Sequence, residues 1–385
     1  MNADERRCAL ALSRMGYHNI TVLRELYNAW GSMADIVKQH AHPEQLAPNM
    51  PERLLAAFAH TDEHLKRADE EMRFAQDNNI SIITLADEAY PQRLKACFDA
   101  PLALFFKGNA NLNAKHCISI VGTRKATPYA ADCIAQLTAR VKQLCPDMLI
   151  VSGLAYGVDI MAHRQAIDHA LPTVAVLAHG LDTLYPSRHR KEATLMMQNG
   201  GLLTEYFSQS KIDKRNFLQR NRIVAGMSAA TLLVESAEHG GGLVTCRLAQ
   251  SYQHDVFAFP GNINNPYSVG CNRLIRDNMA GLVTSAEDIL KAMAWEEDMK
   301  ETVATNGAST MGPSVLGATS ASTAKVPNGA QGVLDVLTKE NDLHIDIIAT
   351  RAGLPVNKVL ALLFQLEMSG MVSSLSGGRY HKVNS

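Results

Sequence analysis

A glycine-containing turn that carries a hydroxyl and two cationic side chains follows a short apolar run. The apolar run covers 117–121 (Cys-Ile-Ser-Ile-Val), and the turn is Gly122-Thr123-Arg124-Lys125. Such a run is typical of a strand buried in a parallel sheet, and glycine lets the backbone turn tightly and lets a ligand approach. A hydroxyl, a guanidinium and an ammonium group at the carboxyl end of a strand suit a phosphate. An ordinary surface loop with two solvated cations has the same composition, and the turn alone does not decide between the two.

Further loops with glycine, hydroxyl or amide groups follow other predicted strands. Because the carboxyl ends of parallel strands meet at one edge of the sheet, we expect these loops to lie close together. Glycine-rich loops that enter helices offer backbone N–H groups to anions. Taken singly, each also fits a tight turn or a close helix contact. The residues concerned are Ser152 at the end of 148–152 with Gly153 after it, His179 to Asp182 after 173–178, Gly240, Gly241, Gly242 and Thr245 after 230–234, and Pro260 to Arg273, which includes Asn272, after 255–259.

Arg220, Asn221 and Arg222 are expected to add positive charge at the same edge. Arginine can bind a phosphate through two parallel hydrogen bonds, which lysine cannot. Residues two apart do not share a face of a regular helix, so we expect these arginines near a helix start, where side-chain directions diverge.

Asp159 and His163 are four residues apart in a predicted helix and suggest either a metal or an acid–base pair. The structural interpretation is favoured, with Asp159 stabilising the helix amino terminus. The chain has no HExxH motif, no GxGxxG fingerprint, no GxxxxGK loop and no GxSxG elbow. These absences argue against zinc, dinucleotide binding, nucleotide hydrolysis and serine hydrolysis. We therefore expect no metal site and no cofactor.

The elements that must position these loops alternate between strands and helices. This alternation predicts βαβ units and an α/β fold with a Rossmann-like, doubly wound and mostly parallel sheet. A further edge strand is expected at 80–84, and the apolar run 102–106 leads into the sheet. The main strands are predicted at 117–121, 148–152, 173–178, 201–205, 230–234, 255–259 and 281–285.

Two smaller domains are predicted to flank the Rossmann-like domain, which is assigned to 79–298. Residues 1–78 have apolar residues at helical spacing and are interpreted as a helical domain resembling SAM or helix-hairpin-helix modules. Residues 299–328 are rich in Ala, Ser, Thr and Gly, as in a flexible linker. Residues 329–385 predict three helices and a β-hairpin, the pattern of a winged helix. Its third helix is largely apolar, which favours a partner-binding role over reading of a DNA sequence.

Composition limits the class of protein. The 385 residues carry a net charge of −1, so a polyanionic partner must be held by a local patch of positive charge. The seven cysteines include no CxxC pair and favour reduced thiols in the cytoplasm. No apolar run has the length of a membrane span, and no secretory signal is present. The sequence thus predicts a cytoplasmic protein that does not enter a membrane.

The ordered set of motifs resembles the DNA-processing protein A family (DprA, also called Smf). Ile120 to Lys125 resembles the family's VG(S/T)R loop, and 151–163 resembles its SGxAxGxDxxAH segment. Residues 175–186, 220–226, 241–245 and 260–275 resemble AVLxxGxDxxYP, RNRIIxG, SGSxxT and PGxxxxPxSxGxNxLI, in that order. The strong match covers about 80–290.

The resemblance implies a recombination mediator that binds single-stranded DNA and is not an enzyme. Such proteins protect incoming DNA during natural transformation, load RecA onto it and usually form homodimers. Carried over by position, the resemblance nominates DNA-binding residues at Gly122, Thr123, Arg124, Lys125, Ser152, Gly153, Arg220, Asn221, Arg222, Gly240, Gly241, Gly242 and Asn272. Tyr156 lies at a variable position, where it would either stack on a base or form part of the rim.

Two other classes of function remain as alternatives. One is a nucleotide phosphoribohydrolase-like enzyme, which also uses a Rossmann-type sheet and a glycine-rich phosphate loop. Such enzymes have a PGGxGTxxE segment with a catalytic acid, whereas here Leu243 to Arg247 follow the glycines and supply no glutamate. The other is a winged-helix regulator with a ligand-sensing Rossmann domain. A regulator should prefer a particular duplex sequence, whereas a mediator should bind single strands of any sequence.

Overall fold

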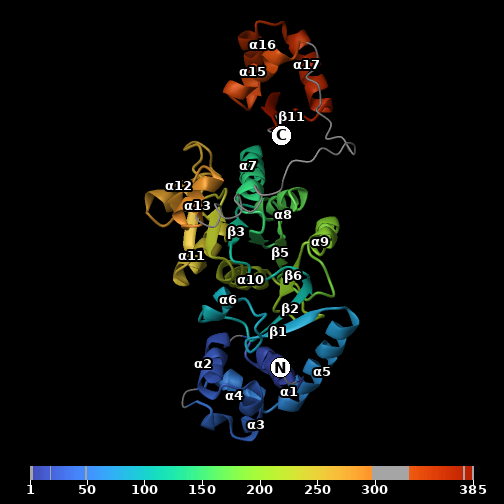
Figure 1. Ribbon diagram of the computed structural model, residues 1–385, viewed down its shortest axis with the longest axis vertical. Coiled ribbons are helices and arrows are strands. Elements are labelled where there is room, and N and C mark those ends of the chain that lie inside the picture. Colours follow the sequence, from blue (N-terminus) through green and yellow to red (C-terminus); the bar gives the residue numbers. More distant parts are fainter. Residues whose placement is uncertain (1–2, 18, 48–49, 297–328, 376–377, 384–385) are drawn as a thin grey trace, which may run out of the picture. The chain divides into compact units, whose positions relative to one another are not determined.

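The computed structural model describes residues 3–17, 19–47, 50–296, 329–375 and 378–383 (Figure 1). These residues fall into two compact units, one on each side of 297–328. The predicted linker at 299–328 and the turn residues Ser376 and Gly377 lie outside the described residues.

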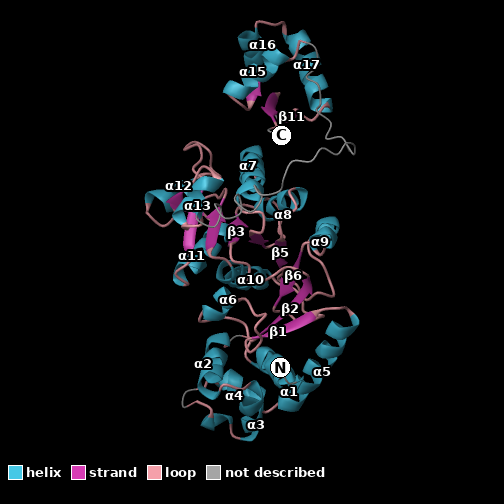
Figure 2. Ribbon diagram, viewed as in Figure 1, coloured by secondary structure: helices cyan, strands magenta, loops and turns pink. Residues whose placement is uncertain are grey.

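The first unit contains a nine-stranded sheet with the order β1-β2-β6-β5-β4-β3-β7-β8-β9 (Figure 2). All pairings from β6 to β9 are parallel, while β2 pairs antiparallel with both β1 and β6. The mostly parallel α/β sheet predicted from the sequence is therefore confirmed. The strands are β1 (Ser81–Thr84), β2 (Ala103–Gly108), β3 (Cys117–Val121), β4 (Leu149–Ser152), β5 (Thr173–Val176), β6 (Gly200–Thr204), β7 (Ala230–Leu233), β8 (Asp255–Ala258) and β9 (Gly281–Leu282).

Successive side chains of a strand point to opposite faces of the sheet, and here both faces are apolar. Helices therefore cover both faces. On one face, Ile118 and Ile120 of β3 share a buried core with α7, α8 and α13. On the other face, Cys117 and Val121 of the same strand share a core with α10, α11 and α12. The helices are α6 (Gln92–Ala96), α7 (Pro128–Leu144), α8 (Val158–Asp168), α9 (Arg190–Met196), α10 (Lys214–Met227), α11 (Gly241–Ser251), α12 (Val269–Arg276) and α13 (Ala286–Ala292).

The amino-terminal helices belong to the same compact unit as the sheet. Arg24 donates from Nη2 to the carbonyl oxygen of Lys95 at 2.8 Å. The buried carboxylate of Glu71 accepts hydrogen bonds from the backbone N–H of Ser208 at 2.8 Å and from its hydroxyl at 2.6 Å. These contacts join the helices to α6 and to the loop after β6. The helices are α1 (Ala3–Met15), α2 (Ile20–Trp30), α3 (Met33–Lys38), α4 (Glu52–Phe58) and α5 (Thr61–Asp77).

The second unit is a winged helix, as predicted. It consists of α15 (Gln331–Lys339), β10 (Leu343–His344), α16 (Ile345–Ala352), α17 (Val356–Met368), β11 (Val372–Leu375) and β12 (Arg379–Lys382). The short strand β10 was not predicted, because two residues are too few to show alternation. It pairs antiparallel with β12.

No single helix among the described residues is both long and apolar enough to cross a membrane. Helices α16 and α17 reach that length and composition only as a pair bent by 106°. None of the seven cysteines, all of which lie in the described residues, forms a disulfide.

Candidate nucleic-acid interface

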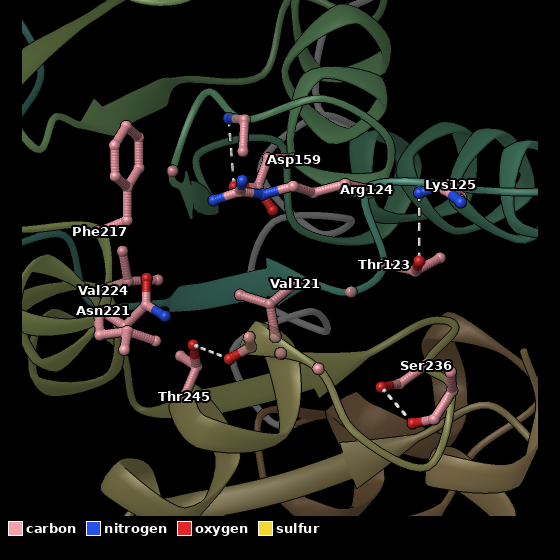
Figure 3. A pocket seen from close by; sticks show the side chains of 18 of the residues that line it. Val121, Thr123, Arg124, Lys125, Asp159, Phe217, Asn221, Val224, Ser236 and Thr245 are labelled. Atoms are coloured by element: carbon pink, nitrogen blue, oxygen red, sulfur yellow. Dashed lines mark hydrogen bonds between the residues drawn. The ribbon is translucent and has the colours of Figure 1, made fainter. Parts of the chain in front are cut away.

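A cavity of about 450 Å³ lies at the carboxyl ends of β3, β4 and β7 (Figure 3). The chain leaves β3 for β4 on one side and leaves β7 for β8 on the other, so this is a topological switch point, where open α/β sheets bind ligands. We call it the switch-point cavity. Its lining includes Gly122, Thr123, Arg124, Lys125, Gly153, Ala155, Asp159, Phe217, Leu218, Arg220, Asn221, Val224, Ser236, His239, Gly240, Gly241, Gly242, Thr245 and Tyr267.

Backbone hydrogen bonds fix the 122–125 turn between two neighbouring segments. Thr123 donates its N–H to the carbonyl oxygen of Glu235 at 2.8 Å, and Val158 donates to the carbonyl oxygen of Thr123 at 3.1 Å. The buried carboxylate of Glu235 in turn accepts from the N–H and the hydroxyl of Thr127, both at 2.8 Å. The turn is thus held to the end of β7 and to the start of α8.

Two glycines are required for this packing. Gly157 has φ +76°, and a Cβ there would lie 2.2 Å from the carbonyl oxygen of Thr123. A Cβ on Gly122 would lie 2.6 Å from Cγ2 of Val158. Any side chain at either position would force the 122–125 turn away from the start of α8.

Arg124 and Lys125 are the two cations of the turn that remain available to a ligand. Both are exposed, and neither forms an ion pair within the part of the chain that the structure describes. The Arg124 guanidinium lies over the ring of Phe217, 5.4 Å from its centroid. The Lys125 N–H donates to the Thr123 hydroxyl oxygen at 3.1 Å, which leaves the Thr123 hydroxyl proton free to donate.

A helix amino terminus adds partial positive charge at the same place. Helix α11 begins at Gly241, with Gly240 as its cap, and both glycines line the cavity. The first N–H groups of a helix have no partner within the helix and favour anions. The cavity therefore combines backbone donors, a hydroxyl and two cations, which is the chemistry of a phosphate site.

Arg220 lines the cavity, but its guanidinium forms hydrogen bonds with backbone carbonyl oxygens of the protein. The side chain is buried, and Nη1 donates to the carbonyl oxygens of Gly153, at 2.5 Å, and of Val176. Burial lowers the pKa of Arg220, and the negative charge of Asp159 opposes this shift. Burial likewise raises the pKa of Asp159, and the charge of Arg220 opposes it. The charges of Arg220 and of the half-buried Asp159, both of which line the cavity, thus compensate each other.

Three nominated residues do not line the cavity. Ser152 is buried and donates from Oγ to the carbonyl oxygen of Ile120 at 2.6 Å. Arg222 is buried in an ion pair with Glu205 and also donates to the carbonyl oxygen of Asp99. Asn272 donates to the carbonyl oxygen of Gly261 at 2.9 Å and accepts from its N–H at 3.0 Å.

The placement of the two arginines corrects our expectation about the helix. Arg220 and Arg222 lie in the middle of α10, which runs from Lys214 to Met227, and not near its start. In a regular helix, residues two apart point in directions about 160° apart. Arg220 accordingly reaches β4 and β5, whereas Arg222 reaches Glu205 beyond β6.

Phe217 lines the cavity and was not identified from the sequence, whereas His239 and Tyr267 also line it and lie on loops that were expected at this edge without being singled out as site residues. Helical spacing could have identified Phe217, because it precedes Arg220 by three residues and Asn221 by four and therefore lies on the same face of the helix. His239 and Tyr267 lie on loops, where spacing carries no such information.

The other two candidate residues, Tyr156 and His163, contact side chains of the protein outside the cavity. Tyr156 packs edge-on against the ring of His189, with centroids 5.0 Å apart, and is not among the cavity residues. His163 is fully buried, with Nδ1 at 2.8 Å from the Thr173 hydroxyl oxygen. In the described ranges no group of three or more His, Cys, Asp or Glu side chains is placed to hold a metal.

The sheet, its switch-point cavity and the winged helix place this chain among Rossmann-like α/β proteins with an added winged-helix unit. Family models match both units. Residues 81–294 match DNA recombination-mediator protein A, and residues 317–378 match the DprA winged helix domain. The chain belongs to the DprA/Smf family of DNA recombination mediators, whose members are not enzymes. This membership sets aside the phosphoribohydrolase alternative.

Individual relatives agree with this assignment. The chain is 33% identical to Protein Smf of Escherichia coli over 323 residues, covering 81% of this chain and 80% of that protein. It is 35% identical to DNA processing protein DprA of Streptococcus pneumoniae over 207 residues, which is 54% of this chain and 72% of the relative.

Two solved structures resemble this one. DprA from Streptococcus pneumoniae has a TM-score of 0.62 and 29% identity, covering 73% of this chain and 95% of that one. DNA processing protein A from Helicobacter pylori, whose structure was described for its single-stranded DNA binding mode, has a TM-score of 0.51 and 28% identity and covers 56% and 96% of the two chains.

Proposed function

We propose that this chain binds single-stranded DNA in the switch-point cavity, largely through phosphate groups and without sequence preference. The observation that carries the proposal is the pairing of the exposed cations Arg124 and Lys125 with the amino terminus of α11 at one cavity. Phosphate contacts of this kind carry no sequence information. The Helicobacter pylori relative, described as binding single-stranded DNA, supports the same ligand class.

The residues in this proposal differ in role. Thr123, Arg124, Lys125 and the Gly240–Gly242 turn contact phosphate, and Phe217 offers an aromatic face to a base. Gly122, Gly153 and Arg220 shape the cavity. Ser152, Arg222 and Asn272 support the surrounding backbone.

Fluorescence anisotropy with a labelled single strand and its duplex, each titrated at several salt concentrations, tests this function. We expect preference for the single strand. The log–log dependence of affinity on salt should have a slope of about 0.7 for each phosphate neutralised. Failure to bind the single strand, or preference for a particular duplex sequence, would contradict the proposal and favour the regulator alternative.

We further propose that the bound strand is passed to RecA in the cytoplasm by a homodimer of this chain, protecting incoming DNA during natural transformation. Family membership supports this role. RecA should associate faster with a labelled strand that this protein already covers, and light scattering should report twice the mass of the chain. No acceleration would contradict RecA loading, and a monomeric mass would contradict the homodimer.

The winged helix is proposed to bind a partner other than a DNA sequence. On α17, Leu360, Phe364 and Met368 are 50%, 63% and 75% exposed, and Lys358 is the only basic residue of this helix. A helix that reads base edges would need more hydrogen-bonding side chains. Removal of 329–385 should leave the affinity for single strands within about threefold, because the cations of the cavity lie in the other unit.

A further inference from the structure

A second cavity, of about 460 Å³, lies between the amino-terminal helices and the loop that follows β6. Its lining includes Arg14 and Tyr17 from α1 and the segment after it, Arg67 from α5, the loop 205–211, and Asn216 of α10. It shares no lining residue with the switch-point cavity.

The first turns of α10 separate the two cavities. Asn216 lines the second cavity, whereas Phe217 and Leu218, the next residues along the chain, line the switch-point cavity. Asn216 is fixed there, because its side-chain oxygen accepts from the Tyr17 hydroxyl and its carbonyl oxygen accepts from the Tyr206 hydroxyl, both at 3.2 Å. A helix is about 10 Å wide, so only a short stretch of a nucleic-acid strand is needed to pass from one cavity to the other.

The surface at this crossing is basic and aromatic. Lys211, Lys214 and Arg215 are exposed on the loop and first turn of α10, against one carboxylate, Asp213, which pairs with Arg215. Beside the crossing, Tyr185 packs edge-on against Phe217, with centroids 5.6 Å apart. Cations that alternate with aromatic rings are the usual surface for single strands.

The second cavity continues this pattern. Arg14 and Lys211 are exposed and form no ion pair within the described part of the chain. Tyr17 is half-buried, and its ring lies 5.9 Å from that of Tyr206. Arg67 lies over Phe207, 5.4 Å from the ring centroid.

Two of the acidic groups near this cavity are paired with arginine, while a third, Asp182, accepts from the N–H of the lining residue Gln209 at 2.9 Å. Glu205 forms a buried ion pair with Arg222, and Glu71 forms one with Arg67 at 2.7 Å. The cavity therefore presents two cations, Lys211 and Arg14, the latter with Nη1 at 3.0 Å from Nδ1 of His64, together with aromatic surface.

We propose that the second cavity is a further subsite for the same single strand, which leaves the switch-point cavity, crosses the first turn of α10 and enters between α1 and the loop after β6. The subsite rests on the proposed function, because it needs a strand already held at Arg124 and Lys125. It makes the amino-terminal helices part of the DNA-binding surface.

Oligomers of two lengths separate the subsite from the main site. A thymidine oligomer of about six nucleotides fills one cavity, and one of about 20 nucleotides spans both. The double variant Arg14→Glu/Lys211→Glu should weaken binding of the long oligomer about tenfold and lower its salt slope by about 1.4, while the short oligomer binds as before. The double variant Arg53→Glu/Lys66→Glu is the matched control, because it reverses two exposed cations, on α4 and α5, that do not line the cavity.

The outcomes are distinguishable. If the wild-type protein binds neither oligomer, the proposed function itself fails. If it binds both and the Arg14→Glu/Lys211→Glu variant binds the long oligomer as tightly as the control does, the subsite is overturned while the main site stands. An equal loss for both lengths also overturns it, because the charge would then act at a distance.

Photocrosslinking locates the strand independently of affinity. A 4-thiothymidine placed at successive positions of the long oligomer should crosslink to the peptide with Phe217 from one position and to the peptide with Tyr17 from a position a few nucleotides away. Absence of any crosslink to the Tyr17 peptide, with the Phe217 peptide labelled, would overturn the subsite.

Discussion

The guanidinium of Arg220 fills the space where a side chain on residue 153 would begin. A Cβ placed on Gly153 would lie 2.5 Å from Nη2 of Arg220, while Nη1 donates to the Gly153 carbonyl oxygen at 2.5 Å. The same Nη1 also donates to Val176, the last residue of β5. Arg220 thus joins the ends of β4 and β5 beneath the cavity, and only glycine at 153 permits this.

Replacement of this glycine should therefore cost both stability and binding. We expect Gly153→Ala to lower the free energy of unfolding by about 1–3 kcal/mol, because a buried group is overpacked. It should also weaken single-strand binding by displacing Arg220. Urea unfolding and anisotropy measure the two effects. Gly241→Ala is the control for the unfolding measurement alone, because the nearest neighbour of its added Cβ would be Asn221 Nδ2 at 3.9 Å, and an equal unfolding midpoint for both variants would contradict the argument.

Arg124 should behave in the opposite way, because it is exposed and unpaired among the described residues. Arg124→Glu should weaken single-strand binding at least about tenfold and lower the salt slope by about 0.7, with an unchanged melting temperature. Arg247→Glu makes the same charge change at an exposed position of α11 outside the cavity and should bind normally. Unchanged affinity of Arg124→Glu would remove this residue from the site.

The buried pair of Arg222 and Glu205 should control stability and not DNA affinity directly. Burial raises the pKa of Glu205, and the Arg222 charge opposes this shift. Arg222→Met should cost about 3–5 kcal/mol, because it leaves a buried carboxylate without its partner. The double variant Arg222→Met/Glu205→Gln should recover much of the loss in urea unfolding. A single variant as stable as the wild type would contradict the pairing.

His163 should make stability depend on pH. It is buried, its Nε2 has no hydrogen-bond partner among the described residues, and burial lowers its pKa to about 3. In the unfolded chain a histidine has a pKa of about 6.5. Between these values the unfolded state binds a proton that the folded state does not, so stability falls as pH falls from about 6.5 toward 3, by at most about 1.4 kcal/mol per pH unit.

Urea unfolding at several pH values measures this contribution. His163→Gln should show a shallower decline than the wild type between about pH 6 and pH 4, by about 1 kcal/mol per pH unit. Parallel curves for His163→Gln and the wild type would show that His163 does not titrate in this way.

The sheet could be predicted because its strands carry a direct signal. Five consecutive buried residues at 117–121 and the repeated spacing of similar runs identify parallel strands. Topology then brought Gly122 to Lys125, Gly153 and the Gly240–Gly242 turn to one cavity, as expected. Strand order and the residue types of the loops were together sufficient to predict which backbone segments form the site.

The direction of individual side chains could not be predicted in the same way. The composition of Arg220-Asn221-Arg222 does not show that Arg220 donates hydrogen bonds to two backbone carbonyl groups, nor that Arg222 forms an ion pair with Glu205. Those partners come from strands and loops far apart in the sequence. Burial of a charge is a tertiary property, so a motif shows which residues occur near the site and not which of them reach the ligand.

The construction of the 122–125 turn and of the start of α11 has a genetic consequence. Anion-binding groups supplied by the main chain are not deleted when a side chain is exchanged. The sensitive positions are instead those where Gly122 and Gly157 leave room for neighbouring backbone and side chains. A random mutagenesis screen for loss of DNA binding should therefore yield alleles that add bulk at these glycines more often than alleles that remove a single positive charge.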